Sequence, residues 1–255
     1  FERALDNVRR DLKSFDIQQP YSHAVYFARL ATTVPESSVE LLREQAAKVT
    51  AERVKAYGDK LRRSNQRLFG QALLHGNIDL DSATRVRKLL EELPFKQLRK
   101  EDLTRVRLAQ LPPGRDVFLV RPEPNPDNIN HALLCQYWTG AEATDAVLTE
   151  IFHSLIADPF FERLRTEQQL GYIVTSNAQR VGLVSKMSLV IQSSVLAPDG
   201  LLDAVDSFMK SFRLDLLAVP GARLERIKAA YVDRLLRPDD RMANEAQRWW
   251  SEIVA

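Results

Sequence analysis

Apolar residues recur at spacings of three and four along the first part of the chain, which is the pattern of helices that bury one face. The clearest case runs from Phe1 to Phe15, where Leu5, Val8 and Leu12 share one side. Ser37 or Ser38, Thr50 and Asp79 are suitable N-caps for later helices. Helices are therefore predicted over 22–32, after Ser38, over 50–61 and over 79–93, with one strand over 65–74.

From residue 105 onward, stretches with alternating or continuous apolar residues predict strands, and they are interspersed with longer helical patterns. Strands are expected over residues 105–111, 116–120, 128–138, 173–177 and 183–193. Helices are expected over residues 144–155, 160–169, 200–217, 222–236 and 240–255. Gly171 is expected to end the second of these helices at its C′ position. Strands grouped in this way indicate an α+β fold with antiparallel sheets packed against helices.

The change of pattern near residues 96–111 divides the chain. We predict two α+β domains, residues 1–103 and residues 104–255, because 255 residues suffice for two substantial cores. The chain begins at Phe1 without a methionine, inside a helical pattern, and it ends inside another helical pattern. Both ends are therefore expected to lie within a longer protein.

Composition and charge remove several classes of function. The 36 basic and 34 acidic residues leave a net charge of +2, which gives no basic field for nucleic acid or a membrane surface. No apolar run approaches the roughly 20 residues that span a bilayer, and no signal peptide is visible. The single cysteine, Cys135, lies in an apolar run and is expected to be a buried core thiol. We therefore expect a cytoplasmic protein without nucleic-acid or membrane partners.

The common catalytic motifs are absent from the sequence. None of the four histidines belongs to an H-x-x-E-H motif, and no G-x-S-x-G or phosphate-binding glycine loop is present. His153 and Glu150 share a predicted helix and could hold a metal or relay a proton, although an ordinary helical histidine is the favoured interpretation. No metal site is expected within this chain.

Arg165 and Tyr172 lie seven residues apart, at the end of a predicted helix and the start of a predicted strand. Arginine presents five donors in a rigid fork, and tyrosine presents one hydroxyl on a stiff ring. Together they suit a peptide carbonyl or the oxyanion of a tetrahedral intermediate. In the structural alternative, Arg165 pairs with Glu162 on the helix surface and Tyr172 packs at the strand start. The residues taken alone favour this structural alternative.

The stretch Asp158-Pro-Phe-Phe-Glu-Arg-Leu-Arg-Thr-Glu-Gln-Gln-Leu-Gly-Tyr-Ile-Val174 resembles the insulysin/pitrilysin family of zinc metallopeptidases. That family shows a nearly identical Leu-Arg-Thr-x-x-Gln-Leu-Gly-Tyr-x-Val in its C-terminal half. Leu74-His-Gly-Asn77, Val190-Ile-Gln-Ser193 and Trp250-Ser-Glu-Ile253 are similar to family segments in the same order. The resemblance covers essentially the whole chain. It implies α/β sandwich domains, with the latter part of the third family domain at 1–103 and most of the fourth at 104–255.

The resemblance implies a zinc metalloendopeptidase that degrades peptides in an enclosed chamber. Arg165 would bind a backbone carbonyl of the peptide substrate, and Tyr172 would bind substrate and act catalytically by stabilising the oxyanion. Zinc would be a cofactor of the full-length enzyme, bound by an H-x-x-E-H motif in an N-terminal half outside this chain. This chain would then be inactive alone and would need that half as its partner. A homodimer is also compatible with the resemblance.

One segment departs from the family pattern, and two other functions stay open. Some relatives carry a lysine-rich segment associated with polyphosphate or nucleotide binding, but the comparable segment here is Arg237-Pro-Asp-Asp-Arg241, so that site is not expected. A non-catalytic homologue, acting as a scaffold or peptide-binding subunit, is the first alternative. The intact Arg165 and Tyr172 pair favours the peptidase over it. An independent binding domain without a peptidase connection is the second alternative, which the two chain ends disfavour.

Overall fold

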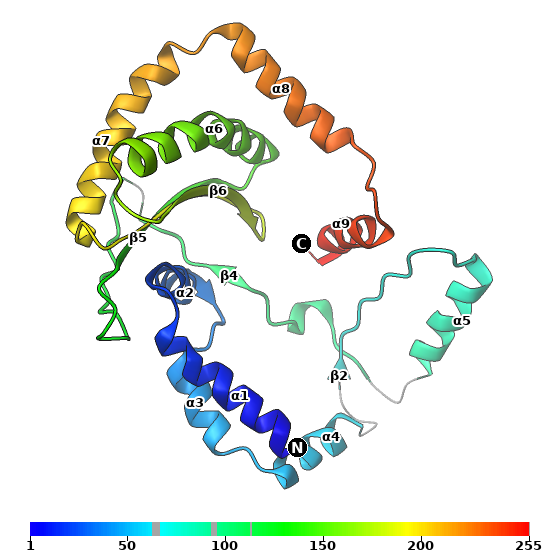
Figure 1. The fold of residues 1–255 in the computed structure, drawn as a ribbon. Helices are drawn as coiled ribbons and strands as arrows, with labels where there is room; N and C mark the ends of the chain where they lie inside the picture. Colours follow the sequence, from blue (N-terminus) through cyan, green and yellow to red (C-terminus); the bar gives the residue numbers. More distant parts are fainter. Residues whose placement is uncertain (63–66, 93–95, 113, 255) are drawn as a thin grey trace. The chain divides into compact units, whose positions relative to one another are not determined.

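The computed structural model describes residues 1–62, 67–92, 96–112 and 114–254 (Figure 1). The chain forms two compact units, and each unit combines separate stretches of sequence. The first unit contains Phe1–Leu12, Ser37–Arg107 and Pro238–Ala255, and the second contains Lys13–Glu36 and Leu108–Arg237. The division into family domains at residues 103 and 104 stays a prediction. No described helix is both long and apolar enough to cross a membrane.

The first unit is mostly helical. Its elements are most of α1 (Glu2–Ser14), α3 (Val39–Ala47), α4 (Ala51–Leu61), β2 (Arg67–Leu68), α5 (Leu80–Glu91), β3 (Lys96–Gln97), η2 (Lys100–Asp102) and α9 (Met242–Val254). The predicted caps are confirmed, because the side chains of Ser38, Thr50 and Asp79 each accept a hydrogen bond from the third residue after them.

The strand predicted over residues 65–74 is mostly wrong. Only β2 is a strand, and it pairs in parallel with the two residues of β3. Residues 65 and 66 lie outside the described residues. After β2, the Gln71 side chain donates to the Ile253 carbonyl of α9. The local alternation of apolar residues therefore predicted a long strand, although the partner strand β3 is only two residues long.

The second unit is built around a three-stranded antiparallel sheet in the order β5 (His131–Gly140), β7 (Val184–Ser193), β6 (Ile173–Val181). The central strand β7 is buried on both faces along almost its whole length, as expected of a core strand. Met187, Leu189 and Ile191 on one face join the hydrophobic core formed with α6 (Ala143–Phe161) and α7 (Pro198–Leu217). The other face meets α2 (Pro20–Thr32), on the opposite side of the sheet in Figure 1. This arrangement confirms the predicted antiparallel sheet packed against helices.

The remaining elements of the second unit are short, except for one long helix. They are η1 (Phe15–Ile17), β1 (Thr33–Val34), β4 (Arg107–Leu108), η3 (Glu162–Glu167) and α8 (Gly221–Leu236). The strand predicted over 105–111 is reduced to β4, which pairs with β1. Residues 116–120 form no strand, although their apolar run predicted one, and Val117, Phe118 and Val120 are exposed.

The helices predicted over 144–155 and 160–169 are one continuous helical stretch. Helix α6 passes through Pro159 and leads directly into η3, a π-helix. A proline inside a helix removes one backbone hydrogen bond and costs about 3 kcal/mol or more. Ile156, Phe160 and Leu164 are all 0% exposed, so the apolar core holds both sides of the proline in place. Burial of these side chains therefore offsets the cost of Pro159, which lies in the gap between the two predicted helices.

Candidate functional site

The turn after η3 brings Arg165 and Tyr172 together. The Gln168 amide donates to the Arg163 carbonyl, and the Leu170 amide donates to the Leu164 carbonyl, both at 3.0 Å. Gln169 has a φ of 51°, the left-handed conformation that ends many helices. The expectation that Gly171 occupies the C′ position is therefore wrong, because Gln169 occupies it.

Gly171 has a different role, which is to permit close approach of two backbones. A Cβ at this position would lie 1.9 Å from the Gln192 carbonyl oxygen and 3.1 Å from the Ser193 Cα. Only glycine allows the chain to pass so close to the end of β7. The residue that follows, Tyr172, is thereby set at a fixed place beside the first pair of the β6–β7 ladder, Ile173 with Gln192.

Arg165 and Tyr172 face each other at the surface. The guanidinium carbon of Arg165 lies 5.5 Å from the centre of the Tyr172 ring, within the range of a cation–π contact. Tyr172 is 86% exposed, while Arg165 is half-buried. Among the described residues no ion pair joins Arg165 to Glu162, and the Tyr172 ring is not packed into a core. The structure therefore does not support the structural alternative for this pair.

An open depression of about 550 Å³ lies beside the pair, lined by Phe161, Arg165, Thr166 and Gln169. Arg165 lines this depression and also contacts the Tyr172 ring, which is not part of the lining. The five guanidinium donors and the phenol hydroxyl are thus presented to an accessible surface. Such a surface can accept the carbonyl groups of an extended peptide.

Arg163, two residues before Arg165, is bound in a different way, for which no sequence pattern provided a signal. Its guanidinium forms an ion pair with Asp215 of α7, donates to the Ser211 hydroxyl at 3.0 Å and lies 5.8 Å from the centre of the Phe208 ring. These contacts fasten η3 to α7. They hold the backbone that carries Arg165 while leaving the Arg165 side chain to face outward.

The other sequence candidates take separate partners. His153 Nε2 lies 3.1 Å from the Ser176 hydroxyl, whereas Glu150 accepts a hydrogen bond from Arg234 at 2.9 Å. Within residues 1–62, 67–92, 96–112 and 114–254, no group of three histidine, cysteine, aspartate or glutamate side chains is placed to hold a metal. The pair on α6 is therefore not assembled as a metal site.

Cys135 packs half-buried against the core between the sheet and its helices. Burial raises the pKa of the Cys135 thiol to about 11, and the carboxylate of Asp206 adds to the rise. A thiol with so high a pKa stays protonated and is a poor nucleophile at neutral pH. This agrees with the expected core role.

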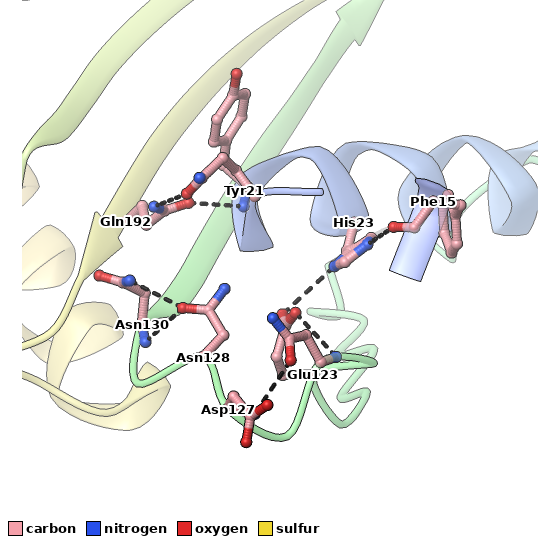
Figure 2. Close-up of polar contacts among 10 residues, drawn as sticks. Phe15, Tyr21, His23, Glu123, Asp127, Asn128, Asn130 and Gln192 are labelled. Carbon is pink, nitrogen blue, oxygen red and sulfur yellow. Dashed lines mark hydrogen bonds and ion pairs between the residues drawn. The ribbon is translucent and has the colours of Figure 1, made fainter. Parts of the chain in front are cut away.

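A polar cluster around the start of α2 was missed by sequence reasoning (Figure 2). His23 is 3% exposed, with Nε2 at 2.6 Å from the Phe15 carbonyl and Nδ1 at 3.4 Å from Glu123 Oε2. Because a carbonyl only accepts, Nε2 carries the hydrogen. The side chain of Gln192 lies nearby and contacts the backbone of Tyr21.

Comparison with known proteins adds a family to this geometry. Residues 151–250 match the family model described as PQQ synthase PqqF-like, C-terminal lobe domain 4. The chain is 30% identical to the insulin-degrading enzyme of Homo sapiens over 262 aligned positions, which cover 100% of this chain and 25% of that protein. It is 28% identical to a nardilysin-like protein of Arabidopsis thaliana, covering 73% of this chain and 19% of the relative.

The fold comparison agrees with the sequence comparison. The crystal structure of pitrilysin superposes with a TM-score of 0.72 at 19% identity, covering 96% of this chain and 26% of that one. This chain spans about a quarter of the length of the human relative. The ordered sequence matches, the domain model and the shared fold together show that the chain belongs to the insulysin/pitrilysin family and corresponds to part of its C-terminal half.

Proposed function

We propose that this chain is the substrate-binding C-terminal portion of a zinc metalloendopeptidase that degrades peptides in an enclosed chamber. The observation that carries the proposal is the contact at 5.5 Å between half-buried Arg165 and exposed Tyr172 on the helix-to-strand turn. A purely structural pair would be buried or bound by neighbours, as Arg163 is by Asp215. A stacked pair at an accessible surface instead offers its donors to a ligand.

In the proposed reaction, Arg165 donates hydrogen bonds to a backbone carbonyl of the bound peptide. Its planar fork can hold one carbonyl with two donors or two neighbouring carbonyls with one donor each. The Tyr172 hydroxyl donates to the scissile carbonyl oxygen and stabilises the negative charge that develops there. Both contacts address the peptide backbone, so the site would accept peptides of varied sequence.

The zinc would be held by residues outside this chain. The described residues do not fit the ion, because no group of three suitable ligands is assembled among them. We therefore infer that the partner of this chain is an N-terminal half of the same protein, which would bind zinc. We also infer that residues 104–255 are most of the fourth family domain, supported by the match over 151–250, and that residues 1–103 belong to the third.

The decisive experiment compares the chain alone with the complete protein. The pure chain is expected to bind no stoichiometric zinc and to cleave no peptide, whereas the complete protein should cleave peptides in a reaction that EDTA stops. Metal content measured by mass spectrometry and cleavage of a fluorogenic peptide report the two properties. Strong EDTA-sensitive cleavage by the pure chain would overturn the proposal. A complete protein without zinc or cleavage would support a scaffold role in its place.

A further inference from the structure

Gln192, at the end of the central strand β7, is bound on two sides by other parts of the second unit. It is 7% exposed, and Figure 2 shows its amide pointing to the start of α2. Its own backbone carbonyl lies against Gly171, the residue before Tyr172. We propose that Gln192 is a positioning residue for Tyr172, holding the phenol where it meets the substrate. This inference rests on the function proposed above for Tyr172.

The side chain of Gln192 completes the N-terminus of α2. The first amides of a helix have no partner within the helix, and a side chain at the N-cap position commonly satisfies one of them. The N-cap residue here, Gln19, makes no such bond. Gln192 Oε1 instead accepts from the Tyr21 amide at 3.2 Å, and Gln192 Nε2 donates to Gln19 Oε1 at 2.7 Å. The helix end is therefore capped from the sheet, which fixes the Gln192 side chain at both of its polar atoms.

The backbone of Gln192 transmits this fixed position to the site. The Cβ that Gly171 lacks would meet the Gln192 carbonyl oxygen at 1.9 Å, so the two backbones are in direct contact. The next residue, Ser193, is 1% exposed, and its hydroxyl accepts from the Val195 amide at 2.9 Å and the Leu196 amide at 3.1 Å. The peptide between residues 192 and 193 is thus immobilised on both sides. Any shift of this peptide moves Gly171, and Tyr172 moves with it.

The chemistry of the contact specifies a glutamine. The side chain must accept from a backbone amide and donate to a second amide oxygen at the same time. Glutamate keeps the acceptor but cannot donate to Gln19, and leucine keeps only the volume. A buried amide left without its partner carries a desolvation penalty, so the backbone would move to relieve it. Displacement by a fraction of an ångström at Tyr172 is enough to weaken an oxyanion contact.

The test is a double-mutant cycle in the complete enzyme. Gln192→Leu is expected to lower kcat for a fluorogenic peptide by roughly 10- to 100-fold with little change in KM, because the phenol loses its alignment while Arg165 still binds the peptide. In a Tyr172→Phe background the same substitution should lower kcat less than about twofold, since no hydroxyl is left to misplace. Gln192→Glu should give an intermediate decrease with the same dependence on Tyr172.

Two further variants keep the cycle decisive. Gln19→Leu, at an exposed position, removes only the acceptor for Gln192 Nε2. It should lower kcat only where the Tyr172 hydroxyl is present. This variant keeps the test available if Gln192→Leu does not fold. Gln179→Leu, an exposed glutamine at the far end of β6, serves as the matched control and should leave kcat unchanged. Equal losses of kcat in the wild-type and Tyr172→Phe backgrounds, or no loss, would overturn the inference alone. Full turnover by Tyr172→Phe itself would overturn the proposed function.

Discussion

Arg165 stacks on Tyr172, with 5.5 Å between the guanidinium carbon and the ring centre. This contact holds the two donor groups next to each other on one helix-to-strand turn. Preorganised donors are worth more in catalysis than donors that must be ordered during the reaction. The stacking also explains how a tyrosine that is 86% exposed can keep a defined orientation.

The first prediction concerns the phenol hydroxyl. Tyr172→Phe in the complete enzyme should reduce kcat by roughly 10- to 1000-fold, as expected when one oxyanion donor is lost. The melting temperature should not change, because the hydroxyl lies on an exposed ring. Tyr57→Phe, at another exposed tyrosine on α4, is the control and should keep full turnover. A Tyr172→Phe enzyme with normal kcat would show that the hydroxyl has no catalytic role.

A second prediction separates the two neighbouring arginines. Arg165→Lys keeps the charge but loses the planar fork, so KM for peptide substrates should rise by about 10-fold or more, equivalent to losing part of a charged hydrogen bond. Arg163→Lys should mainly lower the melting temperature and raise KM much less, since Arg163 contacts Asp215 and Ser211 and affects the site only through the backbone that carries Arg165. Steady-state kinetics and thermal unfolding of both variants provide the comparison. The reverse assignment of effects would contradict the site as described.

Gly171 provides a third prediction, on stability. Gly171→Ala places a Cβ against the Gln192 carbonyl oxygen, and such overpacking typically costs about 1–3 kcal/mol of unfolding free energy. Gly58→Ala in α4 meets no atom within 4 Å and replaces a glycine inside a helix, so it should stabilise by roughly 0.5–1 kcal/mol. Urea unfolding of the two variants measures both effects. A neutral Gly171→Ala would mean that the two backbones are not in contact.

The fourth prediction concerns pH and the buried thiol. Because the pKa of Cys135 is raised from 9.0 to about 11, its thiolate fraction at pH 8 is about 100-fold lower than that of an unperturbed cysteine, and iodoacetamide should react correspondingly slowly. The raised pKa favours the folded state fully below pH 9, and this contribution is lost as the pH rises through about 11. Alkylation rates in native buffer and in denaturant test the first point. Equal rates in the two conditions would show that the thiol is exposed.

The fold class and the helix starts could be predicted from the sequence because their signals are local. A serine, threonine or aspartate before a helical pattern forms its cap within three residues, as Ser38, Thr50 and Asp79 do. Strands need partners elsewhere in the chain, and alternation alone does not supply them. This is why the strand predicted over 116–120 is absent and the one predicted over 65–74 is reduced to β2.

The candidate site was only partly within reach of sequence reasoning. The seven-residue spacing of Arg165 and Tyr172 across a helix-to-strand junction suggested that the two side chains meet. In the structure the Arg165 guanidinium lies against the Tyr172 ring. The π-helix and the left-handed Gln169 were not predictable, because burial of Leu164 and Leu170 on either side imposes them. The bond from Gln192 to Tyr21 joins positions 171 residues apart, and no local pattern reports such a distance.

The capping of α2 by a residue of β7 has a consequence for the order in which the protein assembles on the ribosome. Tyr21 is synthesised 171 residues before the glutamine that caps its amide. At about 5–20 residues per second, roughly 9–34 s pass before that glutamine has been added. During this interval the start of α2 lacks the partner that the finished sheet provides. The start of α2 therefore gains this cap only after the last strand of the sheet has been synthesised.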